Sequence, residues 1–213
     1  MIDDRRTRPT PIVISEVQWV LPGRRSPHCG DTATRHSPSS EVVVTSDLQQ
    51  AKRPVSAVLA GPYGHPFHPI LVTVPIGAWV AGLVFDIGSL VVDEPDFLAE
   101  GALWLIAIGV LGALAAAAIG FLDLLAIPSG TRAFRTGLLH MSLNLAVTIA
   151  FAIGFLWRQA GDGPRGPVAL GPLLLSAASL AVLGVSGFLG GRLAYHYGVR
   201  VADEASQAAG FQR

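Results

Sequence analysis

Seven ionisable side chains lie inside or beside long apolar stretches of this 213-residue chain, and they are its candidates for chemistry. They are four histidines, two aspartates and one arginine: His65, His68, Asp86, Asp123, His140, Arg192 and His196. Neutral imidazole is a common ligand of iron, copper and zinc. An ionisable group at membrane depth is energetically costly and is therefore a candidate for function. These residue types predict a site for a transition metal or a haem.

The apolar stretches that must position these residues are long enough to cross a lipid bilayer. Four runs lack Asp, Glu, Lys and Arg: 54–85, 101–122, 136–157 and 166–191. A helix needs roughly 20 apolar residues to span the hydrocarbon layer, and the runs show none of the alternation typical of barrel strands. Helices also satisfy their own backbone hydrogen bonds where water is absent. The sequence therefore predicts an all-α, membrane-embedded antiparallel four-helix bundle that sits in the lipid bilayer.

The composition excludes several other classes of protein. Charged residues make up 14% of the chain and hydrophobic residues 51%, whereas soluble domains carry about 25% charged residues. The apolar content is too high for a chain that is disordered throughout. The formal net charge is zero, so no basic surface points to nucleic acid as a partner. A membrane protein is the class that remains.

Turn-forming residues between the runs set the expected limits of the helices. We expect four helices, near 69–92, 101–127, 133–157 and 168–195, separated by turns that contain Pro and Gly. Pro69 suits the start of a helix because its missing N–H has no partner there, and Pro75 should kink the first helix.

The chain then divides into three parts. Residues 1–53 are polar and we expect them to be a disordered tail, residues 54–201 form the four-helix domain, and residues 202–213 form a short C-terminal tail. The first tail contains His28, Cys29 and His36, whose spacing matches no strong zinc pattern.

Basic residues indicate which side of the membrane each end of the bundle faces. Lys and Arg concentrate in cytoplasmic connections. If both termini and the 128–135 loop share one side, that side has seven basic residues: Lys52, Arg53, Arg132, Arg135, Arg192, Arg200 and Arg213. The opposite side has two, Arg158 and Arg165. We therefore expect a multi-pass protein of a bacterial inner membrane, with both termini in the cytoplasm.

The histidines of the helical domain are expected at one depth, in the cytoplasmic half of the bundle. His65 and His68 open the first helix, His140 lies about two turns into the third, and His196 ends the fourth. A b-type haem needs two imidazoles on opposing helices. We expect His140 to be the central ligand of a haem or a metal, with His65, His68 or His196 completing the set.

Two further polar residues fall near the predicted ligands. Asp123 lies about one turn before the second helix ends, and Asn144 lies one turn beyond His140 on the same face. Either could hold the second ring nitrogen of a ligating histidine and fix its tautomer. Asp86 is the exception, because its position places it in the opposite leaflet.

Other functions are compatible with the same residues. The polar side chains could serve only as interhelical hydrogen bonds in a scaffold or assembly subunit without a cofactor. Alternatively, Asp86 and Asp123 could carry ions or protons in a small transporter. The chain contains no phosphate-binding loop, no nucleophile elbow and no Cys pair. The absence of these motifs favours a protein that is not itself an enzyme, although a redox subunit remains compatible.

Several segments carry a family resemblance over about 61–201. The paired His-Pro opening Gly64-His65-Pro66-Phe67-His68-Pro69 is followed by Pro75 and Asp86, and later by Gly120-Phe121-Leu122-Asp123, by Arg135-Thr136-Gly137-Leu138-Leu139-His140, and by Gly187-Phe188-Leu189-Gly190-Gly191. The pattern resembles a bacterial family of four-helix integral membrane proteins of unknown function, sometimes joined to or encoded beside Rieske-type iron–sulfur domains. The resemblance implies a redox setting, with any Rieske partner a separate protein.

The resemblance also implies an altered position in this chain. In the family a histidine commonly follows the paired glycines, where this chain has Arg192. If that histidine is a ligand in relatives, His196, one turn later, would take its place here.

Overall fold

The computed structural model describes residues 46–54, 66–160, 163–209 and 211, all of which belong to one compact unit, Ser37–Arg213. The prediction of a disordered tail falls mostly on residues 1–45, and the histidine prediction at His65 falls in 55–65. Both lie outside the described residues, as do His28, Cys29 and His36.

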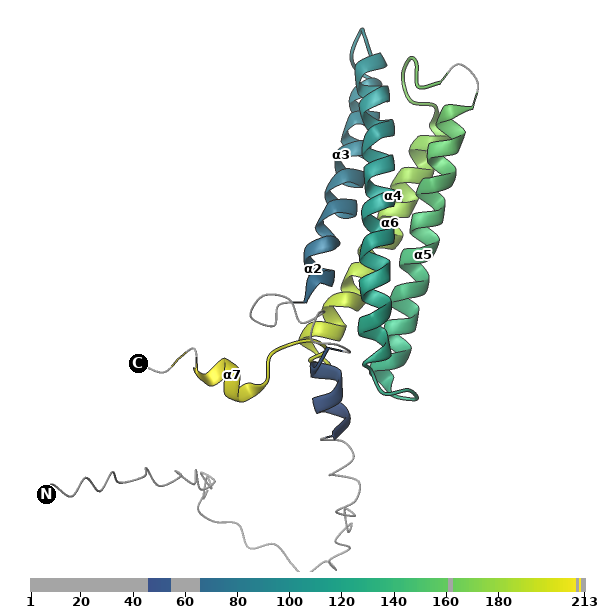
Figure 1. Cartoon of the computed structure of the whole chain (residues 1–213). Helices are drawn as coiled ribbons and strands as arrows, with labels where there is room; N and C mark the ends of the chain where they lie inside the picture. The colour runs from purple at the N-terminus through teal and green to yellow at the C-terminus, as the bar shows by residue number, and fades with distance from the viewer. Residues whose placement is uncertain (1–45, 55–65, 161–162, 210, 212–213) are drawn as a thin grey trace, which may run out of the picture. The chain divides into compact units, whose positions relative to one another are not determined.

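Four long apolar helices pack against one another in the described part of the chain, which contains no strand (Figure 1). The first span consists of α2 (Phe67–Leu71) and α3 (Thr73–Ser89), and the others are α4 (Asp96–Leu125), α5 (Arg132–Gln159) and α6 (Leu170–Tyr195). A short helix, α7 (Glu204–Ala209), follows. Each span is long and apolar enough to cross a membrane. The predicted antiparallel bundle is confirmed.

Local sequence explains where the helices begin and break. The break between α2 and α3 falls at Val72, three residues before Pro75, whose ring has no N–H to donate to the preceding turn. The Thr131 side chain accepts a hydrogen bond from the Phe134 N–H at 3.1 Å and so caps α5. Helix α5 continues to Gln159, so Arg158 lies in the helix and not in the following loop, where the charge count had placed it.

The spans α2–α3 and α5 have equivalent residues 72 positions apart. His68 corresponds to His140, Trp79 to Phe151 and Asp86 to Arg158. Each of these pairs is in direct contact: the histidine rings meet edge to face, the Trp79 and Phe151 rings stack 4.2 Å apart, and Asp86 and Arg158 form a salt bridge.

Helices α4 and α6 repeat with a spacing of 70 positions. Four buried residues of α4, namely Ala102, Ile106, Gly109 and Ala116, correspond to four buried residues of α6, namely Pro172, Ser176, Ser179 and Ser186. A Cβ atom at Gly101 would lie 2.7 Å from the Phe85 ring, and one at Gly171 would lie 2.7 Å from the Trp157 ring. The two helical hairpins are therefore structural repeats, related by an approximate twofold axis that runs along the bundle.

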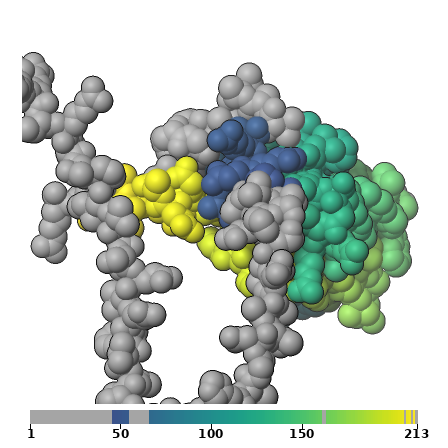
Figure 2. All heavy atoms as spheres, turned by 90° about the horizontal axis from the view of Figure 1, so that it is seen from below, coloured from purple at the N-terminus to yellow at the C-terminus, as the bar shows by residue number. Residues whose placement is uncertain are grey.

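We call the two ends of the bundle the His68 end and the Asp86 end. At the His68 end, where α2 and α5 begin, residues 46–52 are helical, so the prediction of a disordered tail is wrong for this part of 1–53. They lie next to the chain that follows α6 (Figure 2). The Arg200 N–H donates a hydrogen bond to the Ala51 carbonyl at 3.1 Å. At the Asp86 end, α3 and α5 finish and α4 and α6 begin.

Candidate histidine site

His68 and His140 face each other near the His68 end of the bundle. Their ring centroids are 6.3 Å apart and the ring planes make an angle of 82°. His68 lies in the short helix α2, and His140 lies on the third turn of α5. Because the two positions are equivalent in the repeats, the two rings approach the twofold axis from opposite sides.

A main-chain carbonyl of α4 holds the His68 ring. The Nδ1 atom lies 2.9 Å from the Ala116 oxygen. A carbonyl oxygen can only accept, so Nδ1 carries the proton and Nε2 carries a lone pair. Among the described residues, none forms a hydrogen bond with that Nε2 atom. Gly120, one turn after Ala116, makes room for the ring, because a Cβ atom there would lie 2.8 Å from Cε1.

His140 is held in the same way and has one additional partner. Its Nδ1–H donates to the Ser186 carbonyl at 2.8 Å, and the Ser186 hydroxyl lies 3.0 Å from Nδ1 and donates to the His140 carbonyl at 3.2 Å. The Asn144 amide donates to Nε2 at 3.1 Å. Gly190 again sits under the ring, since a Cβ atom there would lie 3.0 Å from Cε1. Both ring nitrogens of His140 are therefore engaged.

Asp123 is engaged by a different residue. Its Oδ1 atom lies 3.0 Å from Nε of Arg200, whose backbone adopts the left-handed conformation at φ 59°. That conformation is unfavourable for a residue with a side chain, and the ion pair helps to offset its cost. The sequence had suggested Asp123 and Asn144 as the residues that hold a histidine ring nitrogen. Asn144 does hold Nε2 of His140, and the Ala116 and Ser186 carbonyls hold Nδ1 of the two rings.

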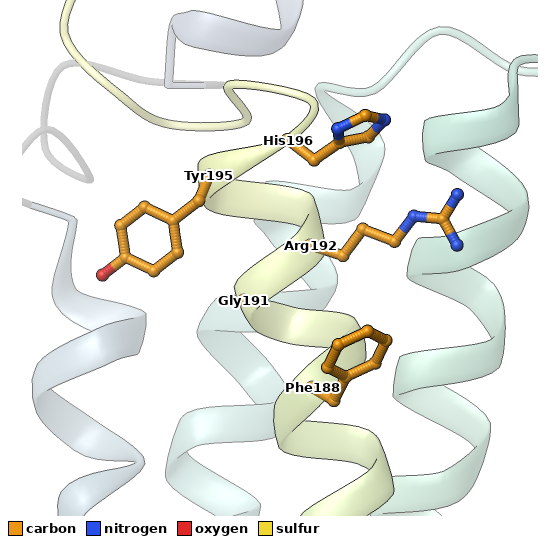
Figure 3. A pocket seen from close by; sticks show the side chains of 5 residues that line it. All are labelled: Phe188, Gly191, Arg192, Tyr195 and His196. Atoms are coloured by element: carbon orange, nitrogen blue, oxygen red, sulfur yellow. The ribbon is translucent and has the colours of Figure 1, made fainter.

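His196 and Arg192 lie on the exposed surface of α6 (Figure 3). The His196 ring packs against Tyr197, with centroids 4.9 Å apart, and Arg192 lies over the face of the same tyrosine, at 5.5 Å. Within the described part of the chain, no three His, Cys, Asp or Glu side chains come together as a metal-binding group. The structure thus brings together His68 and His140, with Asn144 beside them, and leaves His196 outside the pair.

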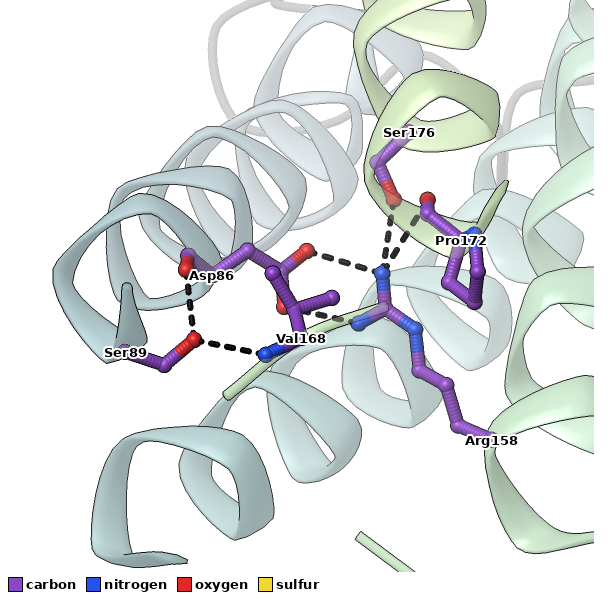
Figure 4. Close-up of polar contacts among 6 residues, drawn as sticks. All are labelled: Asp86, Ser89, Arg158, Val168, Pro172 and Ser176. Carbon is purple, nitrogen blue, oxygen red and sulfur yellow. Dashed lines mark hydrogen bonds and ion pairs between the residues drawn. The ribbon is translucent and has the colours of Figure 1, made fainter. Parts of the chain in front are cut away.

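Asp86 is fully engaged at the opposite end of the bundle (Figure 4). Both of its carboxylate oxygens accept hydrogen bonds from Arg158, at 2.9 and 2.8 Å, and only 1% of its side chain is exposed. Arg158 also donates to the Ser176 hydroxyl and to the Pro172 carbonyl. The Ser89 hydroxyl donates to the Asp86 carbonyl at 2.6 Å and accepts from the Val168 N–H. A planar guanidinium paired in this bidentate way is a specific and strong contact.

Sequence reasoning missed Arg158 as the partner of Asp86, although the sequence does contain a signal. A histidine, an aromatic residue and a charged residue recur with the same spacing, as His68, Trp79 and Asp86 and as His140, Phe151 and Arg158. The steps of 11 and 7 residues in each set are close to whole numbers of helical turns, so each set occupies one face of its helix. A search for internal repeats would have placed the two charges at equivalent positions.

Comparison with known proteins gives a family and nothing more specific. A family model described as a predicted membrane protein (DUF2231) matches residues 64–203. No curated protein and no solved structure matches the chain.

Proposed function

The chain belongs to the DUF2231 family of predicted membrane proteins, and from this premise we propose that it is a membrane-embedded electron-transfer or metal-binding subunit, with His68 and His140 as paired ligands. One observation carries the proposal: two imidazoles meet on the twofold axis, 6.3 Å apart, and both donate Nδ1–H to a main-chain carbonyl. Ligating histidines almost always donate their other ring N–H to such a group, which fixes the ring and raises its basicity.

The donor set fits haem better than a bare metal ion. With Nδ1 protonated in both rings, the two Nε2 atoms are the available ligands. Zinc in proteins takes four ligands or three ligands and a water, whereas the described residues supply two histidines. Haem iron needs only axial ligands from the protein. When bound, the haem would supply one-electron chemistry, and Asn144 would have to release Nε2 of His140.

An absorption spectrum of the full-length protein purified from a bacterial membrane tests this proposal. We expect a Soret band, or a stoichiometric transition metal in elemental analysis, that is lost in both His68→Ala and His140→Ala. His196→Ala is the matched control and should keep the signal, because that ring lies outside the pair. A folded, colourless and metal-free protein that also fails to bind added haemin would refute the proposal.

The orientation and partner are part of the same proposal. Arg158 is paired with Asp86 inside the bundle, so the connections at the Asp86 end carry one basic residue, Arg165, against several at the His68 end. This asymmetry supports an inner-membrane protein with both termini in the cytoplasm. The His68 and His140 pair would then hold its haem or metal near the cytoplasmic side, where a separate redox protein could exchange electrons with that group. To test the orientation, two reporters are fused to the C-terminus, one active only in the cytoplasm and one active only in the periplasm. We expect only the cytoplasmic reporter to be active.

A second candidate is a scaffold that binds no cofactor. It is favoured by the Asn144 hydrogen bond, which already satisfies Nε2 of His140 without any ligand. The transport alternative has less support, because Asp86 is paired with Arg158 and Asp123 with Arg200, so that an ion would have to displace a guanidinium at each. A scaffold predicts that His140→Ala lowers thermal stability in detergent while no cofactor signal exists to lose.

A further inference from the structure

We propose that the groove on the outer surface of α6 at the His68 end binds the headgroup of an anionic phospholipid, with Arg192 contacting the phosphate. The groove encloses about 520 Å³ and is lined by Phe188, Gly191, Arg192, Tyr195 and His196. None of the side chains in this set is acidic. The site is separate from the histidine pair and does not depend on the function proposed above.

The side chains of the groove are arranged for an amphipathic ligand. Gly191 forms the floor, Tyr195 projects on one side, and Phe188 and Arg192 project on the other (Figure 3). Phe188 is 72% exposed and Tyr195 is 92% exposed. An exposed Tyr in the last turn of a transmembrane helix lies at headgroup level, with its ring toward hydrocarbon and its hydroxyl toward polar groups. Phe188, two turns deeper, has an apolar ring suited to hydrocarbon.

Arg192 supplies the charge that selects an anion. It lies in the last turn of α6, and within the described residues it has no acidic partner. Its guanidinium carbon lies 5.5 Å from the centroid of the Tyr197 ring. Such a cation–π contact occupies none of the N–H donors, and among the described residues the Arg192 side chain forms no hydrogen bond. A guanidinium edge matches the oxygens of a phosphate in a bidentate way.

The floor of the groove continues toward the middle of the bundle. Gly187 lies one turn deeper than Gly191, and Gly184 lies nearly one turn deeper again; both are exposed. A Cβ atom at either position would meet nothing within 4 Å. The helix surface at these two glycines is therefore open, and the proposal places an acyl chain against it, below the cationic end.

The other repeat shows what covers the equivalent surface. Seventy positions earlier, α4 has Leu122 in place of Arg192 and Ala126 in place of His196. There residues 46–54 lie against part of the surface, since Leu125 and Ala126 line a hollow together with Ser46, Gln49, Gln50, Arg53 and Pro54. Leu125 is still 54% exposed. Leu122 and Ala126 of the first repeat thus stand where the second repeat has the cationic Arg192 and the polar His196. This difference favours a charged ligand from outside the chain.

Native mass spectrometry of the full-length protein in detergent tests the proposal. Phosphatidylglycerol and phosphatidylethanolamine with identical acyl chains are added in equal amounts. We expect preferential retention of phosphatidylglycerol, and an affinity reduced about tenfold by Arg192→Gln through the loss of one charge-assisted contact. Arg135→Gln is the matched control, because Arg135 is also exposed at the His68 end but lies on α5, outside the groove.

A second variant tests the surface of α6 that is proposed to contact the acyl chain. Gly187→Leu adds a side chain where a Cβ atom meets nothing, so it should keep the fold and still weaken lipid retention. The proposal is overturned if the parent protein shows no preference between the lipids, or if Arg135→Gln and Arg192→Gln weaken retention equally. It is also overturned if Gly187→Leu changes the oligomeric state and leaves lipid retention intact, because the groove would then bind a second copy of the chain.

Discussion

The two ends of the bundle use equivalent positions of the repeats for different chemistry. At the Asp86 end the repeats contribute opposite charges, Asp86 and Arg158, which bind each other through two hydrogen bonds. At the His68 end they contribute the same residue, and the two imidazoles turn away from mutual hydrogen bonding toward the carbonyls of Ala116 and Ser186. Complementary residues on a twofold axis bind each other, whereas two identical imidazoles do not, so their Nε2 atoms remain able to bind another group.

The comparison assigns different roles to the two ends. The carboxylate at the Asp86 end is 1% exposed and both of its oxygens are used, so its role is to join α3 to α5 and α6. At the His68 end, Nε2 of His68 has no hydrogen-bond partner among the described residues, and one amide hydrogen bond restrains Nε2 of His140. Ligand binding is therefore expected at the His68 end and structural stability at the Asp86 end.

The largest expected effect comes from breaking the ion pair. Asp86→Ala leaves Arg158 buried without a counter-charge, which costs about 3–5 kcal/mol when one partner of a buried pair is removed. Thermal unfolding in detergent should show this loss, and exchanging the charges, Asp86→Arg with Arg158→Asp, should recover much of it if the two positions are equivalent. An Asp86→Ala protein as stable as the parent would show that the ion pair does not hold this end together.

An intermediate effect is expected at the glycines under the histidines. Gly120→Ala places a Cβ atom 2.8 Å from the His68 ring, so the ring must move or the helices must separate, at a cost of about 1–3 kcal/mol. Gly77→Ala is the matched control in the first span. A Cβ atom there meets nothing within 4 Å, so the substitution should stabilise the helix by up to about 1 kcal/mol. Equal melting temperatures for the two variants would contradict the close approach of α2 and α4.

The smallest effect separates the ligand role from the structural role. Asn144→Ala removes the hydrogen bond to Nε2 of His140 and should lower stability by about 0.6 kcal/mol, the average for such bonds between side chains in membranes. If the pair binds haem, a haemin titration of this variant should show affinity equal to or higher than that of the parent, because Nε2 is free. A decrease in haemin affinity would instead mean that Asn144 supports the bound state.

How much the sequence predicts differs between the fold and the site. The number of spans and their approximate limits follow from the length of uncharged runs, and α3 and α4 differ from expectation mainly at their ends, which lie at Ser89 and Asp96. The site was predicted as a group of histidines, and two of its candidates, His68 and His140, are in contact. His196 lies on the exposed surface instead of in the group. The sequence predicts the depth of a residue near a helix end, but it does not predict whether the side chain points into the bundle or away from it.

The sequence by itself determined the apolar spans and, in the spacing of His68, Trp79 and Asp86 and of their counterparts, the repeat that relates the two hairpins. Run length and helical period depend on nothing outside one helix, and the repeat is found by comparing the residues of two such helices. Only the tertiary structure decided that Arg158 meets Asp86 and that the Ala116 and Ser186 carbonyls hold the histidines. These pairings depend on how each helix is rotated and shifted against its neighbours, and backbone carbonyls are present at every residue, so no pattern in the sequence marks the ones that are used.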